Sequence, residues 1–405
     1  MREGPLRLRE EELLADPYPL YHELRRRDPV HWSEEWQAWL LSRYADVADC
    51  MADGRLRVSR VEDFSQRLAG DTGTLAPEIR RIEQVLAGWL LFTDPPRHRR
   101  LRGLISRSFT PATIHRLEGS VQERVDELLA GLAGEADLME VLARPLPALT
   151  VADMLGADLA DRDQFMHWSR PLVAFLGTDT LNAEQVCLTA STLQAMEDYF
   201  REILERRRRR PQDDLISGML AAREKDDRLT EEEILHMCTL LFAAGHDTTT
   251  NLIGNSLLAL MEHPEARQAL TRDPGKLEGA IEEFLRWDSP SQIASRWASQ
   301  DLQVGGRLIR QGQVVNFLIG AANRDPQQFP DPDRLDIERT DNRHLSFGRG
   351  IHACVGAFLA RLEARLAVGT VLRRWPGLRL AGTPERQPTI GFRGLKSLPV
   401  ALEAR

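Results

Sequence analysis

The stretch FGRGIHACVGAFLAR, residues 347–361, sets closely spaced glycines around a single cysteine, Cys354, and then continues into a helical pattern. Apolar residues recur at three- and four-residue steps over residues 356–375, which predicts a helix that begins just after the cysteine. Unpaired N–H groups and partial positive charge at the start of a helix stabilise a thiolate. The flanking glycines permit tight turns and close backbone approach. The stretch therefore places a single cysteine, in surroundings that favour its reactive thiolate, at the N-terminus of a predicted helix.

Three kinds of site could use such a cysteine. A zinc site needs about three more Cys or His ligands, and only His352 is near. A phosphate-binding loop needs a preceding strand and a lysine or acidic partner, whereas the segment before residue 347 is irregular. The third is a metal whose other ligands come from a macrocycle, for which one axial thiolate suffices. From these residues alone, the three remain competing interpretations.

The composition is that of a globular protein in a reducing compartment. Of the 405 residues, 42% are hydrophobic and 28% are charged, and the net charge of −8 gives no reason to expect a nucleic acid. The N-terminus has no apolar signal core, and the longest apolar run, near residues 234–245, is too short to span a bilayer. We therefore expect a soluble cytoplasmic protein without a membrane segment. The cysteines are far apart and form no CxxC pair, which disfavours a disulfide framework: Cys50, Cys187, Cys238 and Cys354.

The pattern of the whole chain predicts a mainly α fold with small β-sheets. Strand-like pieces are few: a hairpin at 30–42, strands joined by a glycine turn at 296–315, and further short pieces at 385–403. Strand and helix do not alternate, which disfavours a doubly wound sheet, and no long linker divides the chain. We expect one domain over residues 1–405. Helical periodicity is clearest in four segments besides those discussed below: 19–27, 44–52, 113–132 and 193–210. The last of these ends in five arginines, which we interpret as a helix C-terminus rather than a nucleic-acid patch.

Residues 229–264 predict one long helix with an unusual middle. Thr230 and Glu233 form a capping box, and Pro264 ends the pattern. Gly245 and the run DTTT at 247–250 are poor helix formers between two apolar halves, and threonine hydroxyls can bond back to carbonyls one turn earlier and open the helix. This could be a tolerated kink, or a groove that holds a small ligand beside an acid and an alcohol for proton delivery.

Two further features precede the cysteine segment. Glu283 and Arg286 lie three apart on a predicted helix, a pair that contributes only ~0.2–0.5 kcal/mol on a surface. The segment 322–339 is rich in proline and aspartate, and an irregular stretch of this length is normally functional or tightly anchored.

Together these motifs resemble the cytochrome P450 family. The segment Phe347–Gly356 is similar to the family's haem-binding loop, FGxGxHxCxG, and AGHDT at 244–248 is similar to its oxygen-activation motif. EFLR at 283–286 matches ExxR, and PDRL at 332–335 stands where the family has the arginine that completes that ion network. DPPRH at 94–98 resembles the motif that holds a haem propionate. The motifs follow the family's order and spacing over almost the whole chain, and the departures are minor: Leu335 for a common Phe and Val355 for a common Leu.

The resemblance implies a P450 fold, with a long central helix over a haem and the cysteine loop on the opposite face. It implies haem b with Cys354 as the axial ligand to iron. Thr248 would bind the distal oxygen and Asp247 would relay protons, one facing the haem while the other turns toward solvent. Glu283, Arg286 and Arg334 would form a structural ion network. The residues expected to bind the cofactor are His98, Arg102, Ala244, Gly245, Arg296, Phe347, Gly348, His352, Cys354 and Gly356.

The implied activity is a monooxygenase that inserts one atom of O2 into an apolar small molecule, by hydroxylation or epoxidation. Electrons would come from NAD(P)H through a ferredoxin-type partner, and we expect a monomer. A peroxide-driven oxidase and a non-catalytic redox or gas sensor are the alternatives, and the intact Asp247–Thr248 pair argues against both. The expected substrate pocket comprises Trp89, Leu90, Phe175, Leu176, Leu240, Ala244, Thr248, Ile293, Ala294 and Phe392.

Overall fold

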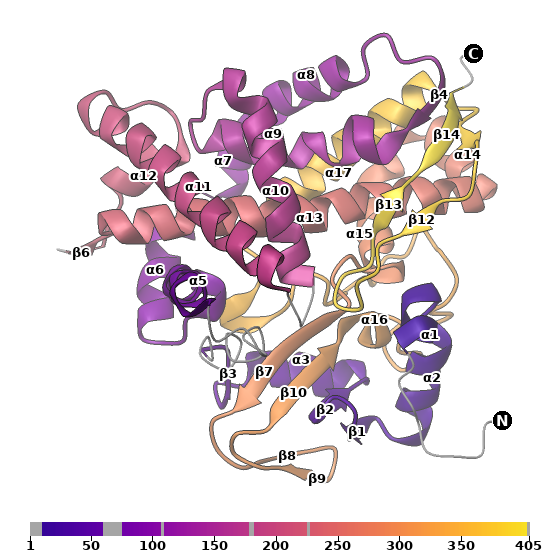
Figure 1. Ribbon diagram of the computed structural model, residues 1–405. Helices are drawn as coiled ribbons and strands as arrows, with labels where there is room; N and C mark the ends of the chain where they lie inside the picture. The colour runs from indigo at the N-terminus through magenta and orange to yellow at the C-terminus, as the bar shows by residue number, and fades with distance from the viewer. Residues whose placement is uncertain (1–9, 60–74, 107–108, 178–181, 225–226, 403–405) are drawn as a thin grey trace.

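The computed structural model of the chain describes residues 10–59, 75–106, 109–177, 182–224 and 227–402. Helices form most of the described chain, and small sheets gather at the lower part and the right-hand edge of the view in Figure 1. The mainly α architecture that the sequence predicts is therefore confirmed. None of the described helices combines the length and the apolar character needed to cross a membrane.

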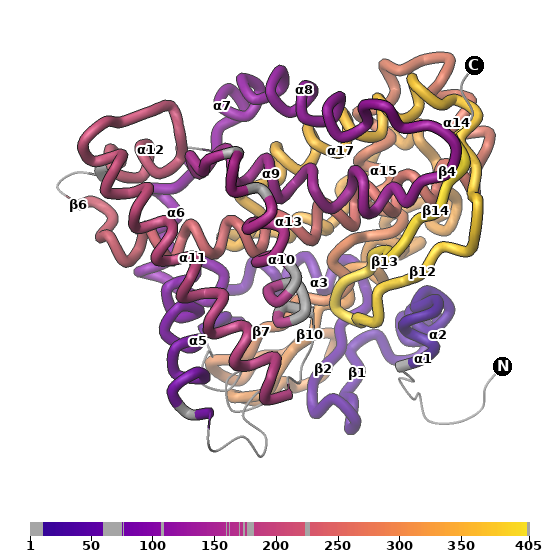
Figure 2. The backbone as a smooth tube through the Cα atoms, turned by 45° about the horizontal axis from the view of Figure 1, so that its top comes forward, coloured from indigo at the N-terminus to yellow at the C-terminus, as the bar shows by residue number. Residues whose placement is uncertain are grey.

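Helix α13, Glu231–Glu262, forms the centre of the molecule. It lies across the middle of the fold in both views, with the helices α9, α11 and α17 packed against it (Figures 1 and 2). Its first turn is closed by the predicted capping box: Glu233 N–H donates to Thr230 Oγ1 at 3.2 Å, and Thr230 N–H donates to Glu233 Oε2 at 3.0 Å. At about 1.5 Å per residue the helix is long enough to cross the whole core.

Besides α13, the described chain contains fifteen α-helices, of which α5, α9, α10, α11, α12, α14, α15 and α17 pack directly against it. The fifteen are α1 Glu10–Ala15, α2 Tyr18–Arg27, α3 Tyr44–Ala52, α5 Ala76–Gly88, α6 Arg97–Ser106, α7 Pro111–Arg116, α8 Glu118–Leu128, α9 Pro145–Met154, α10 Arg162–Gly177, α11 Ala183–Arg209, α12 Leu215–Ala221, α14 Pro264–Arg272, α15 Leu277–Trp287, α16 Ile319–Ala322 and α17 Ala357–Arg374. Shorter helical turns are η2 Leu90–Phe92, η3 Met139–Ala143, η4 Leu159–Asp161, η5 Pro274–Lys276 and η6 Gly350–His352.

The largest sheet joins strands from both ends of the chain in the order β1-β2-β10-β7-β3. The predicted hairpin is confirmed, because Val30 pairs with Leu41 in an antiparallel register. Strand β10 then lies parallel to β2 and antiparallel to β7. The strands of this sheet are β1 Val30–Ser33, β2 Ala38–Leu41, β3 Leu56–Arg57, β7 Ile293–Ala298 and β10 Val314–Leu318.

The remaining strands form small sheets. The predicted glycine turn is confirmed: Gly305 and Gly306, with φ of 54° and 78°, join β8 to β9. Strand β14 pairs with both β4 and β11. The strands are β4 Gly134–Asp137, β5 Arg223–Glu224, β6 Asp227–Arg228, β8 Leu302–Val304, β9 Arg307–Ile309, β11 Arg379–Leu380, β12 Glu385–Arg386, β13 Leu395–Ser397 and β14 Pro399–Leu402.

Two predicted helices have different bounds in the structure. The segment 113–132 is divided at Leu117 into α7 and α8, and α7 begins at the Thr110 cap, whose hydroxyl accepts from Thr113 N–H at 3.2 Å. Helix α11 begins at Ala183, well before the predicted residue 193, because Asn182 and Gln185 form a capping box there.

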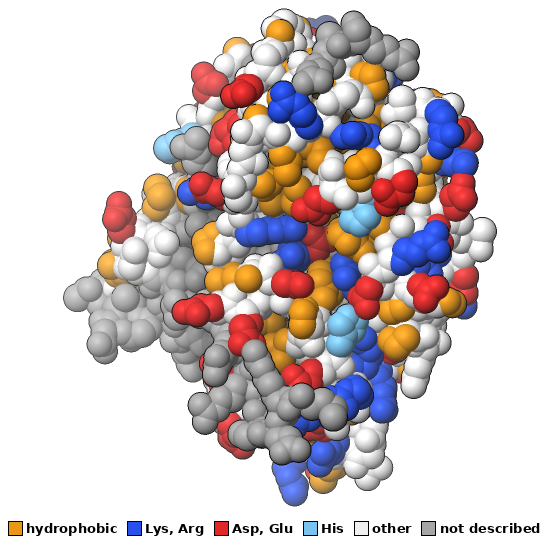
Figure 3. Space-filling model, turned by 90° about the vertical axis from the view of Figure 1, so that its right-hand side faces the viewer, with side chains coloured by type: hydrophobic (Ala, Val, Ile, Leu, Met, Phe, Trp, Pro, Cys, Tyr) orange, Lys and Arg blue, Asp and Glu red, His pale blue; other side chains and the backbone are white. Residues whose placement is uncertain are grey.

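The arginine run at residues 206–210 ends α11, as the sequence predicts. Arg208 pairs with Glu231 Oε2 at 2.9 Å. Arg207 is buried instead of solvated, pairs with Asp214 and donates to the Gly156 carbonyl at 2.9 Å. On the face of the molecule seen in Figure 3, basic and acidic side chains are interspersed rather than gathered into a patch of one sign.

Candidate active site

One short stretch of α13 presents accessible surface in the middle of a buried helix. Every residue from 234 to 260 is buried except Ala244, Gly245 and Thr248. Ala244 and Thr248 are four positions apart and therefore share one face. The Thr248 hydroxyl donates to the Ala244 carbonyl at 3.2 Å, the back-bond expected of a threonine inside a helix. This stretch has the surface that a ligand-binding groove requires.

Gly245 lies where α13 meets α9. A Cβ atom built on Gly245 would lie 3.1 Å from Val151 Cγ2, so the missing side chain allows α9 to approach closely. Next to it, His246 is buried and its Nε2 is 3.0 Å from the Arg144 carbonyl. The histidine therefore belongs to the packing between these helices and not to the accessible stretch.

Asp247 lies on a different face of α13 and is only 7% exposed. Asn251 Nδ2 donates to Asp247 Oδ2 at 3.3 Å. Burial raises the pKa of Asp247 to about 6, while the side-chain amides of Gln387 and Asn251 oppose the rise. The expectation that Asp247 turns toward solvent is wrong, because the C-terminal segment that carries Gln387 covers it. With a pKa near neutrality, the carboxyl group can both hold and release a proton.

The cysteine loop is closed by backbone hydrogen bonds and by two glycines. Cys354 N–H donates to the Phe347 carbonyl at 2.8 Å. Gly348 and Gly350 have φ of 67° and 74°, a region that favours glycine. A Cβ atom on Gly350 would lie 3.1 Å from the Met51 carbonyl oxygen, so a side chain there would disturb the contact with α3. Helix α17 begins at Ala357, as predicted, directly after this loop.

Cys354 is accessible as a residue, although its thiol lies deep among protein atoms. Burial raises the pKa of the Cys354 thiol, while the Gly356 N–H and the charges of Arg102 and Arg361 oppose the rise. The Arg361 guanidinium also lies 4.4 Å from the centre of the Phe347 ring, which ties α17 to the start of the loop. Burial therefore disfavours the thiolate, while the Gly356 N–H and the two arginines favour it.

Basic side chains from three separate elements meet beside this loop. His98 of α6 and His352 of η6 have ring centres 4.3 Å apart, and His98 is only 1% exposed. Neither ring nitrogen of His98 has a hydrogen-bond partner among the residues that the structure describes. Arg296 comes from β7, and Arg102 from α6. We call these four residues the basic cluster.

The four basic side chains of the cluster outnumber the carboxylates that act on them. Burial and Arg102 lower the pKa of His98, and burial together with Arg296 and His98 lowers the pKa of His352 to about 3. Burial lowers the pKa of Arg296 to about 10. Asp94 is the carboxylate that acts on these groups, and it also accepts hydrogen bonds from the backbone of Val58 and Ser59. A bound anion would satisfy the cluster.

Glu283 and Arg286 form the predicted ion pair, fully buried. Arg286 Nη2 lies 2.7 Å from Glu283 Oε1, and the second arginine is Arg339, whose Nε lies 3.2 Å from Glu283 Oε2. The prediction that Arg334 completes the network is wrong, since its side chain is exposed. Only the backbone of Arg334 takes part, because its carbonyl accepts from Arg286 Nη2 at 3.2 Å.

This network anchors the irregular segment before the cysteine loop. Arg286 Nη1 donates to the carbonyls of Asn323 and Pro332 at 2.9 and 2.8 Å. Glu283 accepts the Asp336 N–H at 2.8 Å. The segment 322–339 is therefore held by buried charge, as its composition led us to expect.

The predicted pocket residues divide into two groups. Trp89, Leu90, Phe175 and Leu240 are buried in the core, and Trp89 Nε1 donates to Thr239 Oγ1 at 3.0 Å. The other group keeps accessible surface: Ala244, Thr248, Ile293, Ala294 and Phe392. The side chain of Leu176 lies outside the described residues. Ser291 and Phe392 form an isolated bridge, which brings the C-terminal turn beside the start of β7.

Comparison with known proteins agrees with this geometry. The family model described as Cytochrome P450 matches residues 77–274 and 276–390. The chain is 39% identical to the Biotin biosynthesis cytochrome P450 of Bacillus subtilis (strain 168), over 97% of this chain and 98% of that protein. It is 41% identical to the Vitamin D(3) 25-hydroxylase of Pseudonocardia autotrophica, over 96% and 94%. The crystal structure of P450BioI in complex with hexadec-9Z-enoic acid ligated Acyl Carrier Protein superposes with a TM-score of 0.88 at 37% identity, covering 97% of this chain and all of that one.

The chain therefore belongs to the cytochrome P450 family, and it is a P450 monooxygenase. The family implies a haem cofactor, and the residues present fit one. Cys354 is exposed as a residue and offers a single sulfur ligand. The basic cluster offers partners for carboxylates, including the two ring nitrogens of His98, which have no partner among the described residues.

Proposed function

We propose that this P450 inserts one oxygen atom of O2 into an apolar small molecule, with electrons that come from NAD(P)H through a separate ferredoxin-type protein. The observation that carries the proposal is the basic cluster beside an accessible cysteine. His98 is buried with both ring nitrogens unpartnered among the described residues, and such atoms require a ligand. The carboxylates of a haem are suitable ligands for them.

In this proposal Cys354 binds the iron of haem b, and the basic cluster of His98, Arg102, Arg296 and His352 holds the two propionates. Charge-assisted hydrogen bonds to buried carboxylates are strong, so the cluster would fix the orientation of the cofactor. When bound, a haem with a thiolate ligand supplies the chemistry of O–O cleavage.

The chain's own part in the reaction is to position oxygen and to deliver protons. The accessible Thr248 hydroxyl would hydrogen-bond to oxygen beside α13, and its bond to the Ala244 carbonyl at 3.2 Å would orient it. Asp247 would hold the proton that is passed on, because its pKa of about 6 lies near the working pH. Ala244 would leave room for the oxygen, since it presents only a methyl group to the accessible stretch.

The substrate that we propose is an apolar molecule bound against Ile293, Ala294 and Phe392. These residues keep accessible surface, and their side chains offer no charge to a ligand. Relatives fit this class, since one is named for vitamin D(3) and another is crystallised with hexadec-9Z-enoic acid on an acyl carrier protein. A carrier-bound substrate is therefore one member of the class to be tested.

The proposal is tested with the purified holoprotein, a surrogate ferredoxin and ferredoxin reductase, NAD(P)H and 18O2. Compounds that shift the ferric haem from low to high spin are first selected from fatty acids, steroids and macrolides. We expect one labelled oxygen atom per product molecule. Label from water, or product that forms with hydrogen peroxide but not with O2 and the reducing system, would overturn the proposed reaction. Extraction of free haem into acidified butanone checks for haem b, and loss of the P450-type reduced carbon-monoxide band in Cys354→Ser checks the ligand.

A further inference from the structure

A buried polar stripe on α13 faces the C-terminal segment of the chain. Asp247, Asn251 and Asn255 follow one another at four-residue steps and therefore share one face of the helix. They are 7%, 0% and 3% exposed. The segment opposite them runs from β12 to β13 and contains Gln387 and Gly394, which are joined by a backbone hydrogen bond of 3.1 Å from Gln387 N–H to the Gly394 carbonyl.

The amide of Asn251 is oriented from both sides. Its Oδ1 accepts from Gln387 Nε2 at 3.3 Å, and its Nδ2 donates to Asp247 Oδ2 at 3.3 Å. An amide has its acceptor and its donors on opposite sides of one carbon. Because Gln387 engages the oxygen, the NH2 group of Asn251 is directed at the carboxylate of Asp247. Gln387 also lowers the pKa of Asp247 in its own right.

Gly394 is required for this close approach. A Cβ atom built on Gly394 would lie 1.9 Å from Asn251 Oδ1, a distance at which the amide must move. Asparagine and glycine therefore fit together as a contact between α13 and the C-terminal turn, and any larger residue at 394 would push Asn251 out of line.

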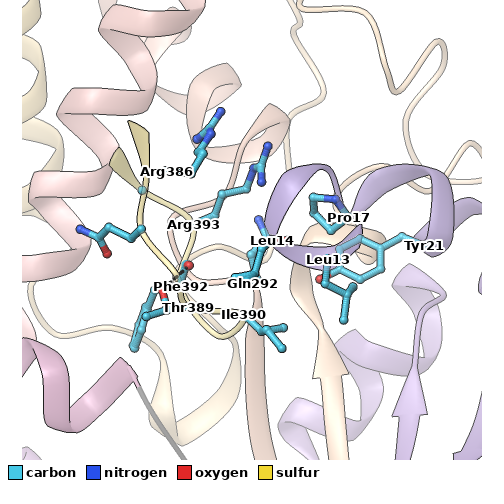
Figure 4. A pocket seen from close by; sticks show the side chains of 12 residues that line it. Leu13, Leu14, Pro17, Tyr21, Gln292, Arg386, Thr389, Ile390, Phe392 and Arg393 are labelled. Atoms are coloured by element: carbon cyan, nitrogen blue, oxygen red, sulfur yellow. Dashed lines mark hydrogen bonds between the residues drawn. The ribbon is translucent and has the colours of Figure 1, made fainter. Parts of the chain in front are cut away.

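The buried carboxylate of Asp288 fixes the position of the turn that carries Phe392 and Arg393. Arg393 Nε donates to Asp288 Oδ1 at 2.7 Å, and Tyr18 of α2 donates its hydroxyl to the same oxygen at 2.8 Å. Asn255 Nδ2 donates to the Arg393 carbonyl at 2.9 Å. Figure 4 shows Arg393 and Phe392 leaving the turn in different directions, with Leu13, Pro17 and Tyr21 of the N-terminal segment across a small pocket from it. The turn thus holds its place independently of the side chain of Gln387.

We propose that Gln387 is a positioning residue for Asp247, acting through Asn251, so that the turn that carries Phe392 also sets the geometry of the proton-relay acid. The proposal rests on the proposed function in one respect, namely that Asp247 is that acid. It joins two tasks in one segment: Phe392 presents a side chain toward the proposed substrate site, while Gln387 orders the carboxylate of Asp247, which lies about 100° around α13 from Thr248.

The charged side chains near Asp247 are engaged with other groups, so its pKa depends on the amides of Gln387 and Asn251. Arg144, at the start of α9, also lowers the pKa of Asp247 from a distance. Arg144 is itself paired with Glu140. On the C-terminal segment Arg386 is engaged with Asn255 Oδ1 at 3.0 Å and with Asp288. The neutral amides are therefore the groups in hydrogen-bonding contact with the carboxylate, and their removal must favour its protonated form.

The decisive variant is Gln387→Leu in the holoprotein. The protonated carboxyl of Asp247 is followed by infrared difference spectroscopy during a pH titration, and Asp247→Asn identifies its band. We expect the midpoint to rise by roughly one pH unit, because a hydrogen bond to the ionised form is lost. Lys396→Gln is the matched control, since Lys396 lies on the same segment with a side chain 67% exposed, and its midpoint is expected to equal that of the wild type.

Gly394→Ala gives a second test that leaves Gln387 in place. The added methyl group displaces Asn251, and the midpoint is again expected to rise. If both variants bind haem normally and titrate like the wild type, Gln387 does not position Asp247 and the proposal is overturned. If the midpoint rises while the ratio of product to electrons stays at the wild-type value, the positioning stands, and the proton role of Asp247 in the proposed function is lost instead. Should Gln387→Leu fail to bind haem, Gln387→Asn, whose amide is one methylene shorter, takes its place in the same titration.

Discussion

Two buried glutamates on neighbouring helices show how the surroundings decide whether an acid is charged. Glu283 of α15 and Glu363 of α17 are 0% and 1% exposed. Glu283 is surrounded by donors: Arg286, Arg339, the Asp336 N–H and Asn342 Nδ2. For Glu363 neither carboxyl oxygen has a hydrogen-bond partner within the described part of the chain. Burial raises its pKa to about 8, and the nearby Thr150 hydroxyl opposes only part of that rise.

The difference teaches that burial alone does not assign a role to an acid. A paired carboxylate anchors backbone, as Glu283 does for the segment before the cysteine loop. An unpaired acid stays protonated near neutral pH and makes the fold sensitive to alkali. Asp247 lies between these extremes, because amides rather than arginines contact it. The following variants separate the three situations.

The largest effect on stability is expected for Glu283→Gln. The substitution removes the counter-charge and leaves Arg286 and Arg339 buried without it, which typically costs ~3–5 kcal/mol. The free energy of unfolding and the haem content should both fall sharply. Glu278→Gln, an exposed position on the same helix, is the control. Equal stability of the two variants would show that the network does not hold the fold.

Glu363→Gln should change how stability depends on pH. The folded-state pKa of about 8 lies above the ordinary value of 4.5, so the folded protein binds more protons than the unfolded chain between these values. The contribution of Glu363 to the stability of the wild type is therefore fully present below pH 4.5 and is lost as the pH rises through 8, with a slope of up to ~1.4 kcal/mol per pH unit.

The glutamine variant cannot ionise and should lose this slope. Between pH 5 and pH 7 its stability relative to the wild type should rise by roughly 2 kcal/mol, measured by unfolding at each pH. Glu127→Gln, with a side chain 62% exposed, should show no such change. Parallel pH curves for wild type and Glu363→Gln would mean that the carboxyl group is already charged.

Arg339→Gln and Arg334→Gln test which arginine completes the network. Arg339 loses its bond to Glu283 at 3.2 Å and another to the Pro330 carbonyl at 2.9 Å, while Arg286 keeps the acid paired. We expect a loss of about 1.5 kcal/mol for Arg339→Gln. The exposed Arg334 should contribute less than about 0.5 kcal/mol. If Arg334→Gln instead lost more stability than Arg339→Gln, Arg334 would complete the network, as the sequence pattern predicts.

Thr248→Ala should have the smallest effect on stability and a clear effect on coupling. Alanine is the better helix former, and the lost back-bond to Ala244 is partly exposed, so stability should change by less than about 0.5 kcal/mol. We expect NADPH consumption to continue while the yield of product per electron pair falls. Thr249→Ser, a buried neighbour that keeps its hydroxyl, serves as the comparison. Unchanged coupling in Thr248→Ala would remove the hydroxyl from the proton path.

The features that the sequence predicted correctly depend on residues close together in the chain. The capping box of α13, the helix after Cys354 and the Glu283–Arg286 pair are all local patterns. The first residue of helix α11 was also predictable from the sequence, because Asn182 and Gln185 have the capping-box spacing. This start signal is local, like the other three.

The features that the sequence did not reveal depend on contacts between distant segments. Arg339 replaces Arg334 because the irregular segment folds back on itself, and no periodic pattern describes such a path. Asp247 is covered by a segment about 140 residues further along, near Gln387. Trp89 and Phe175 were expected to line the substrate pocket, and both are fully buried in the core of the fold. Helical periodicity gives the face of a residue, and the packing partner of that face comes only from the tertiary fold.

The bond between Tyr18 and Asp288 has a consequence for the synthesis of the protein. The two residues are 270 positions apart, and β2 likewise pairs with β10 from the last third of the chain. At roughly 5–20 residues per second, the N-terminal helix leaves the ribosome tens of seconds before its partners exist. During that time Tyr21 and Leu24, which are each 1% exposed in the finished fold, lack the cover that Leu318 and Ala321 give them there. The nascent chain therefore exposes part of this apolar surface until residues 318–321 have been made.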